Sequence, residues 1–178
     1  MHKDCERILI SEAEIKTIVK SMADKINEDY KDKNLLLVGL LKGSIVFMAD
    51  LMKELTVDVK IDFMCVSSYG TSTESSGRVN IIKDVSQPVE GLDVLIVEDI
   101  IDSGNTLSFI LKYFEAKGVN SVKICTLLSK PDRRVVEIPV DYMGAEIPDE
   151  FVIGYGLDYA ENYRNLPYVG ILKRSVYS

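Results

Sequence analysis

The chain has 178 residues, of which 47% are apolar, enough for one domain with a sizeable core, and we expect residues 1–178 to form that domain. No apolar run approaches a membrane span and the first residues lack a secretory pattern, so we expect a cytoplasmic protein with no membrane partner. The net charge of −7 argues against nucleic-acid binding, and three widely spaced cysteines argue against a disulfide framework or a cysteine-based metal site.

The first half of the chain alternates between helical and strand-like patterns. Ser11 and Glu14 form a capping-box pattern, and apolar residues at helical spacing then predict a helix up to about Tyr30. The continuous apolar run Leu35–Leu41 predicts a buried strand. Lys42, Gly43 and Ser44 end this strand, and a second helix is expected over Ile45–Leu55.

The same alternation continues in the middle of the chain. Residues 58–66 alternate as in a strand, and residues 67–78 form a polar stretch rich in Gly, Ser and Thr that predicts a mobile loop. Residues 94–97 predict a buried strand, residues 106–118 a helix that ends at a glycine cap, and residues 122–128 another strand.

The order of these elements predicts the fold class. Apolar strands that alternate with helices favour parallel pairing with helices on both faces, the doubly wound α/β class. Ligands in such sheets bind beyond the carboxyl ends of the strands. The last third is harder to assign, because it has only short apolar runs at Val140–Met143, Phe151–Ile153 and Val169–Leu172.

Three carboxylates and a loop of small residues follow the strand predicted over residues 94–97. Glu98 and Asp99 could accept hydrogen bonds from vicinal hydroxyls of a sugar. The loop opens a helix, so its amides and the Ser103 and Thr106 hydroxyls could bind a phosphate at the helix N-terminus. Asp102 lies between the two groups and is a candidate acid or base. By composition alone, a solvated turn with a Ser or Asn cap remains an alternative.

The whole string from Val97 to Thr106 resembles the ribose-phosphate signature of the type I phosphoribosyltransferases. From about Ile8 to Lys173 the chain is similar to the hypoxanthine-guanine branch of that family, and Asn105 and Ser44 are typical of its bacterial members. The resemblance implies a parallel sheet flanked by helices, with a small hood built from about 1–12 and 145–178. It also implies that Gly104 and Asn105 belong to the 5-phosphate loop.

Two segments resemble loops that act on the leaving group and on the reacting sugar. Lys42 and Gly43 lie in a stretch similar to the pyrophosphate loop of the family, which has a non-proline cis peptide before the Lys. Ser68 and Tyr69 resemble the start of the flexible catalytic loop, whose closure would exclude water from the reaction. Read without the resemblance, these are a strand exit and a surface connection.

The remaining likeness concerns the purine and the metal. Lys130 matches the Lys that donates to the 6-oxo group of the purine, and Phe151 and Val152 match the residues that stack on the base and read its edge. Arg164 matches a residue that approaches pyrophosphate. By the same resemblance Asp158 belongs to the purine and Mg²⁺ site, and Glu98 and Asp99 are its partners as metal ligands. A solvated Lys130 and a core Phe151 are the ordinary alternatives.

The resemblance implies an enzyme of purine salvage. It would transfer the 5-phosphoribosyl group from phosphoribosyl pyrophosphate to a 6-oxopurine, use Mg²⁺, and work as a homodimer or homotetramer. A relative with the same loop that binds messenger RNA is a second hypothesis, which the excess of 28 acidic over 21 basic residues disfavours. A dinucleotide-binding oxidoreductase is excluded because no predicted strand is followed by Gly-x-Gly-x-x-Gly.

Overall fold

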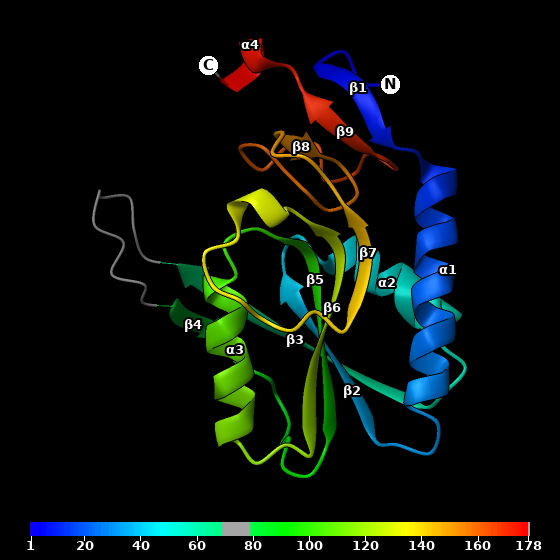
Figure 1. Cartoon of the computed structure of the whole chain (residues 1–178), viewed down its shortest axis with the longest axis vertical. Coiled ribbons are helices and arrows are strands. Elements are labelled where there is room, and N and C mark those ends of the chain that lie inside the picture. The colour runs from blue at the N-terminus through cyan, green and yellow to red at the C-terminus, as the bar shows by residue number, and fades with distance from the viewer. Residues whose placement is uncertain (69–78, 178) are drawn as a thin grey trace.

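The computed structural model describes residues 1–68 and 79–177 of the chain. The strands of the central sheet in this part are β2 (Leu35–Leu41), β3 (Val59–Ser68), β4 (Val79–Lys83), β5 (Asp93–Ile101), β6 (Ser121–Ser129) and β7 (Tyr142–Glu146). Their order is β4-β3-β2-β5-β6-β7, and all neighbours are parallel except the edge pair β3 and β4 (Figure 1). The predicted parallel α/β sheet is therefore confirmed.

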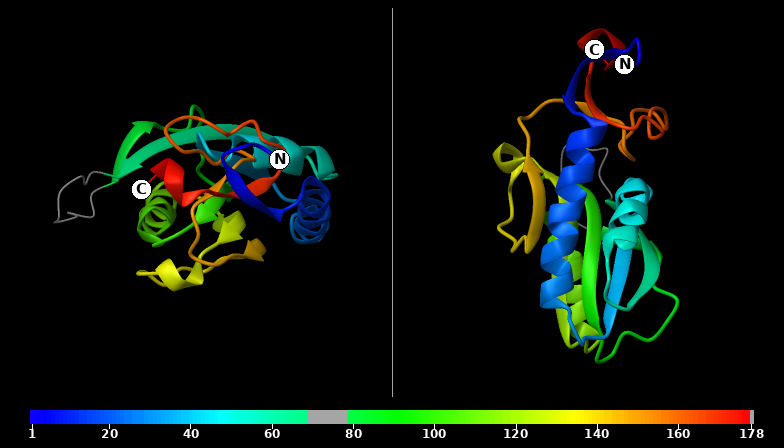
Figure 2. Two further views of the ribbon diagram at one scale, coloured as in Figure 1. Left: turned by 90° about the horizontal axis from the view of Figure 1, so that it is seen from above. Right: turned by 90° about the vertical axis from the view of Figure 1, so that its right-hand side faces the viewer.

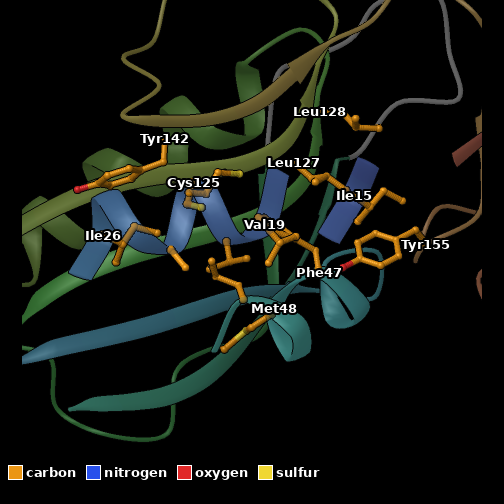
Figure 3. Close-up of a cluster of buried hydrophobic side chains, with 14 of the residues drawn as sticks. Ile15, Val19, Ile26, Phe47, Met48, Cys125, Leu127, Leu128, Tyr142 and Tyr155 are labelled. Atoms are coloured by element: carbon orange, nitrogen blue, oxygen red, sulfur yellow. The ribbon is translucent and has the colours of Figure 1, made fainter. Parts of the chain in front are cut away.

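Helices cover both faces of this sheet, and the alternation of side chains along β2 explains why. Leu35 and Leu37 pack into a core with α1 and α2, whereas Leu36 and Val38 pack into a separate core with α3. Figure 3 shows part of the first core, formed by side chains of α1, α2 and β6. The helices are α1 (Glu12–Asp29), α2 (Ile45–Glu54) and α3 (Asn105–Ala116).

A second sheet joins the two ends of the chain. It contains β1 (Cys5–Ile10), β9 (Val169–Leu172) and β8 (Val152–Ile153) in that order, with antiparallel pairing throughout. A short helix, α4 (Arg174–Tyr177), follows β9. Figure 2 shows both chain ends together at one end of the molecule, beyond the second sheet. These strands lie within the ranges given for the hood, although a local pattern did not reveal β1.

The predicted elements differ from the observed ones mainly at their ends. The capping box of α1 is present, since the Ser11 N–H donates to Oε2 of Glu14 at 2.8 Å and Oγ of Ser11 accepts from the Glu14 N–H at 3.3 Å. The strand expected over 140–143 begins two positions later, and β4 was not predicted. Within the described residues, no helix is long and apolar enough to cross a membrane.

Candidate active site

A cavity of about 370 Å³ opens beyond the carboxyl ends of β2 and β5. Its walls come from the end of β2 and the loop after it, from the segment that joins β5 to α3, and from Asp158 and Arg164 in the loop after β8. Parallel α/β sheets bind their ligands at this edge. The cavity therefore lies where the fold class predicted a site.

The acidic pair Glu98 and Asp99 lies inside β5, because this strand ends at Ile101 and not at Val97 as predicted. The pairing of β5 with β2 stops at Val97, so later residues of β5 keep only β6 as a neighbour. This leaves one side of the acidic pair facing the cavity. Burial, and then the neighbouring Asp99 carboxylate, raise the pKa of Glu98 well above its usual value. A cation or hydroxyl donors at this position would stabilise the charged form of Glu98.

Gly43 lies directly against the carboxylate of Asp99. A Cβ atom at Gly43 would be 1.8 Å from Oδ2 of Asp99, so a side chain has no room here. On its other side, a Cβ atom at Gly156 would be 2.0 Å from the Gly43 carbonyl oxygen. The Leu41–Lys42 peptide bond that precedes this glycine is cis, as the resemblance implied. The loop after β2 is thus enclosed between β5 and the turn at Gly156.

Asp102 and Lys130 face each other beside the cavity wall. Nζ of Lys130 lies 4.0 Å from Oδ1 of Asp102, and this buried oxygen accepts no hydrogen bond from any described residue. Lys130 is 6% exposed and also lies 3.8 Å from the Asp149 carboxylate. A buried acceptor without a donor is costly unless a ligand or water satisfies it. Oδ1 of Asp102 is therefore available to a hydrogen-bond donor of a bound molecule.

The loop before α3 presents backbone amides to the cavity. Gly104 is the N-cap of α3 with φ of +84°, and it caps the helix without a side-chain hydrogen bond. Ser103, Gly104 and Thr106 line the cavity, whereas the side chain of Asn105 is exposed and is not part of the lining. The helix dipole and these uncapped amides favour an anion at this end of the cavity.

Arg134 supports this loop from behind, a role that the sequence did not suggest. Its Nε donates to the Asp102 carbonyl at 3.1 Å, and its second guanidinium nitrogen donates to Oγ of Ser129 at 2.8 Å. The N–H groups of Val135 and Val136 each donate to the Ser103 carbonyl at 3.0 Å. Since Arg133 beside it is also basic, only the fold distinguishes the partly buried anchor Arg134 from the exposed Arg133.

The basic residues predicted for pyrophosphate are brought together by one carboxylate. Oε2 of Glu161 accepts from Lys42 at 2.7 Å, and Oε1 accepts from Arg164 at 3.3 Å. Arg164 also lies 2.9 Å from Oδ1 of Asp158 and donates to the Gly156 carbonyl at 2.8 Å. Glu161 was not predicted, because an exposed Glu in a loop carries no pattern of its own.

Of the residues predicted for the purine, Asp158 lines this cavity, whereas Lys130, Phe151 and Val152 lie outside its lining. The Phe151 ring packs on Tyr177 and Tyr159, and Val152 is 6% exposed within β8. Of the predicted catalytic loop, Ser68 ends β3, and Tyr69 lies outside the described residues.

Comparison with known proteins identifies the family. A model of the phosphoribosyl transferase domain matches residues 8–160. The chain belongs to the phosphoribosyltransferase family. It is 54% identical over 178 residues to a hypoxanthine-guanine phosphoribosyltransferase of Staphylococcus epidermidis, covering 100% of this chain and 99% of the relative. One from Bacillus subtilis is 54% identical over 177 residues, covering 99% and 98%. A crystal structure of a hypoxanthine phosphoribosyltransferase from Staphylococcus aureus superposes with a TM-score of 0.97, at 51% identity, covering 100% and 97% of the two chains.

Phosphoribosyltransferases of this kind generally use Mg²⁺. The described residues contain no group of three or more side chains that could hold a metal ion by themselves. Mg²⁺ does not require such a cage, since it keeps several waters and binds one or two carboxylates together with substrate phosphates. Glu98 and Asp99 on one wall and Asp158 on another supply donors of this kind. The residues present therefore fit the ion.

Proposed function

We propose that this phosphoribosyltransferase transfers the 5-phosphoribosyl group from phosphoribosyl pyrophosphate to hypoxanthine and guanine, with release of pyrophosphate. The observation that carries the proposal is one cavity that joins the acidic end of β5 to the amide-rich start of α3. A sugar phosphate requires these two surfaces, one for hydroxyls and one for an anion. The names of the relatives at 54% identity support the choice of 6-oxopurines as acceptors.

The sugar phosphate would lie along the segment from β5 to α3. Ser103, Gly104 and Thr106 bind the 5-phosphate in this proposal, with Asn105 contributing its backbone N–H. Glu98 and Asp99 orient the ribose through its hydroxyls. Fixing the sugar in this way holds its C1 atom in line with the attacking base. Binding energy thereby offsets part of the entropic barrier before the reaction begins.

Asp102 and Lys130 would act on the purine. Lys130 donates a hydrogen bond to the 6-oxo group, and Asp102 takes the proton from the neighbouring N7 as N9 bonds to C1. A general base contributes about 10² to 10⁴ in rate. Phe151 stacks on the ring, and the main chain of Val152 reads its edge. An amino group at position 6 would leave Lys130 without an acceptor, so adenine is disfavoured.

The leaving pyrophosphate would be held on the opposite side of the sugar. Lys42, Arg164 and the amide of Gly43 stabilise its growing charge. Glu98, Asp99 and Asp158 would hold Mg²⁺, which when bound supplies positive charge to the diphosphate.

A spectrophotometric assay with phosphoribosyl pyrophosphate and Mg²⁺ tests the proposal, with hypoxanthine, guanine, xanthine and adenine each supplied in turn. We expect turnover with hypoxanthine and guanine and almost none with adenine. Turnover of adenine at a similar rate would contradict the role given to Lys130, and inactivity with every purine would contradict the function.

We also propose a cytoplasmic location and a homodimer or homotetramer. Phosphoribosyl pyrophosphate and the nucleotide products are charged phosphate esters that do not cross membranes unaided. Large apolar side chains on α2, β3 and β4 are 39 to 65% exposed and could pack against a second copy: Ile45, Met52, Ile61 and Ile82. Light scattering after gel filtration measures the assembly, and a monomer at micromolar concentration would contradict this proposal.

A further inference from the structure

The ring of Phe151 is held on two sides by other aromatic rings. Tyr177, the last residue of α4, stacks on it with 5.0 Å between centroids and 29° between planes. Tyr159 meets it edge-on at 5.5 Å and 88°. Tyr177 and Tyr159 also contact each other edge-on at 6.4 Å. Three residues from separate segments thus form one aromatic cluster around Phe151.

The Tyr177 ring belongs to α4 and covers one face of the Phe151 ring. In Figures 1 and 2, α4 lies beyond the second sheet, on the side away from the central sheet. The cavity lies at the carboxyl ends of β2 and β5. A ligand that enters from the cavity therefore approaches from the side opposite α4.

We propose that Tyr177 is a positioning residue for the purine base. The inference rests on the proposed function, in which the face of Phe151 that Tyr177 leaves free stacks on the purine. Phe151 is only partly buried, so without a ring behind it the side chain could turn and would have to be ordered when the base binds. Stacking by Tyr177 fixes the plane of Phe151 beforehand, which lowers the cost of binding a flat ligand.

Substitution of Tyr177 tests the proposal through binding of the base alone. For Tyr177→Ala we expect the Kd for IMP and the KM for hypoxanthine to rise about three- to tenfold, the range that an aromatic pair supplies. The Kd for ribose 5-phosphate and the KM for phosphoribosyl pyrophosphate should stay unchanged, because neither ligand carries a purine. Tyr177→Phe should restore wild-type values, since the contact is made by the ring.

His2→Ala is the matched control. His2 meets Tyr163 edge-on at 5.2 Å beside the second sheet, so this variant removes an aromatic contact there without changing the Phe151 cluster. We expect its Kd for IMP to equal that of the wild type. The proposal is overturned if Tyr177→Ala binds IMP with the Kd of the wild type, or if the Kd values for ribose 5-phosphate and IMP rise by the same factor. If the wild type itself bound ribose 5-phosphate but not IMP, the proposed function would fail instead.

Discussion

The ammonium group of Lys130 and the carboxylate of Asp102 are 4.0 Å apart at the edge of the candidate active site. One is a buried donor and the other has a buried acceptor oxygen without a hydrogen bond from the described residues. A 6-oxopurine presents an acceptor at its oxygen and a proton at the neighbouring N7, which is the complementary pattern. In the function proposed above, this pair serves both recognition of the base and proton transfer.

The first prediction concerns Asp102. Asp102→Asn keeps the size of the side chain but removes its ability to accept a proton. We expect kcat to fall about 10²- to 10⁴-fold while both KM values change little, as measured in steady-state assays. Asp149→Asn is the control, because Asp149 is also close to Lys130 but is half exposed. Near-normal turnover of Asp102→Asn would remove Asp102 from the role of base.

The second prediction concerns Lys130. Lys130→Met keeps the length of the side chain but removes the donor. We expect the KM for hypoxanthine to rise about 10- to 100-fold, the value of a hydrogen bond from a charged group, with little change for phosphoribosyl pyrophosphate. Lys123→Met is the control, because Lys123 lies on the preceding strand, β6, but contacts Tyr30 and Tyr142, away from the cavity. We expect it to keep the wild-type KM for hypoxanthine and for phosphoribosyl pyrophosphate. An unaltered KM in Lys130→Met would argue against contact with the base.

The third prediction concerns Arg134. Arg134→Gln removes the guanidinium that holds the Asp102 carbonyl and Ser129. Loss of these charge-assisted hydrogen bonds should make the loop before α3 less ordered. We expect the Kd for ribose 5-phosphate to rise about tenfold, measured by calorimetric titration. Arg133→Gln alters an adjacent basic residue that is 52% exposed, and we expect this variant to have the wild-type Kd for ribose 5-phosphate. An equal rise in Kd in both variants would show that the positive charge of this segment, and not the hydrogen bonds of Arg134 to the loop, supports binding.

The fourth prediction concerns Gly43. In Gly43→Ala the added methyl group would overlap the Asp99 carboxylate, so the loop or the strand must shift. We expect the free energy of unfolding in urea to fall by about 1–3 kcal/mol, as for other overpacked sites, and kcat/KM to fall more than tenfold. A variant that is less stable but fully active would show that the contact supports the fold alone.

The sequence could predict the parts of the fold whose pattern is local. The apolar run of β2 and the capped amphipathic pattern of α1 identify these elements, because burial on two faces leaves a continuous apolar run and burial on one stripe leaves a helical period. The end of β5 was placed too early, since Glu98 and Asp99 are acidic and a buried strand is expected to be apolar. Backbone pairing with β6 continues from Glu98 to Ile101 and keeps both acidic residues inside the strand.

Contacts between distant segments could not be predicted in this way. β1 has only its ends buried and pairs with β9, which lies near the other end of the chain. Arg134 and Glu161 act through partners that no local spacing reveals. The resemblance to a family supplied Lys42, Lys130 and Arg164, but not the groups that hold them in place.

The pairing of β1 with β9 has a consequence for how the protein is made. Ribosomes deliver β1 long before β9, so β1 emerges without its partner. The strands and helices of the central sheet precede Val152 and can assemble on the nascent chain. The wall that carries Asp158 and Arg164 is synthesised after them, so the cavity is complete only once this wall has emerged and packed on the sheet.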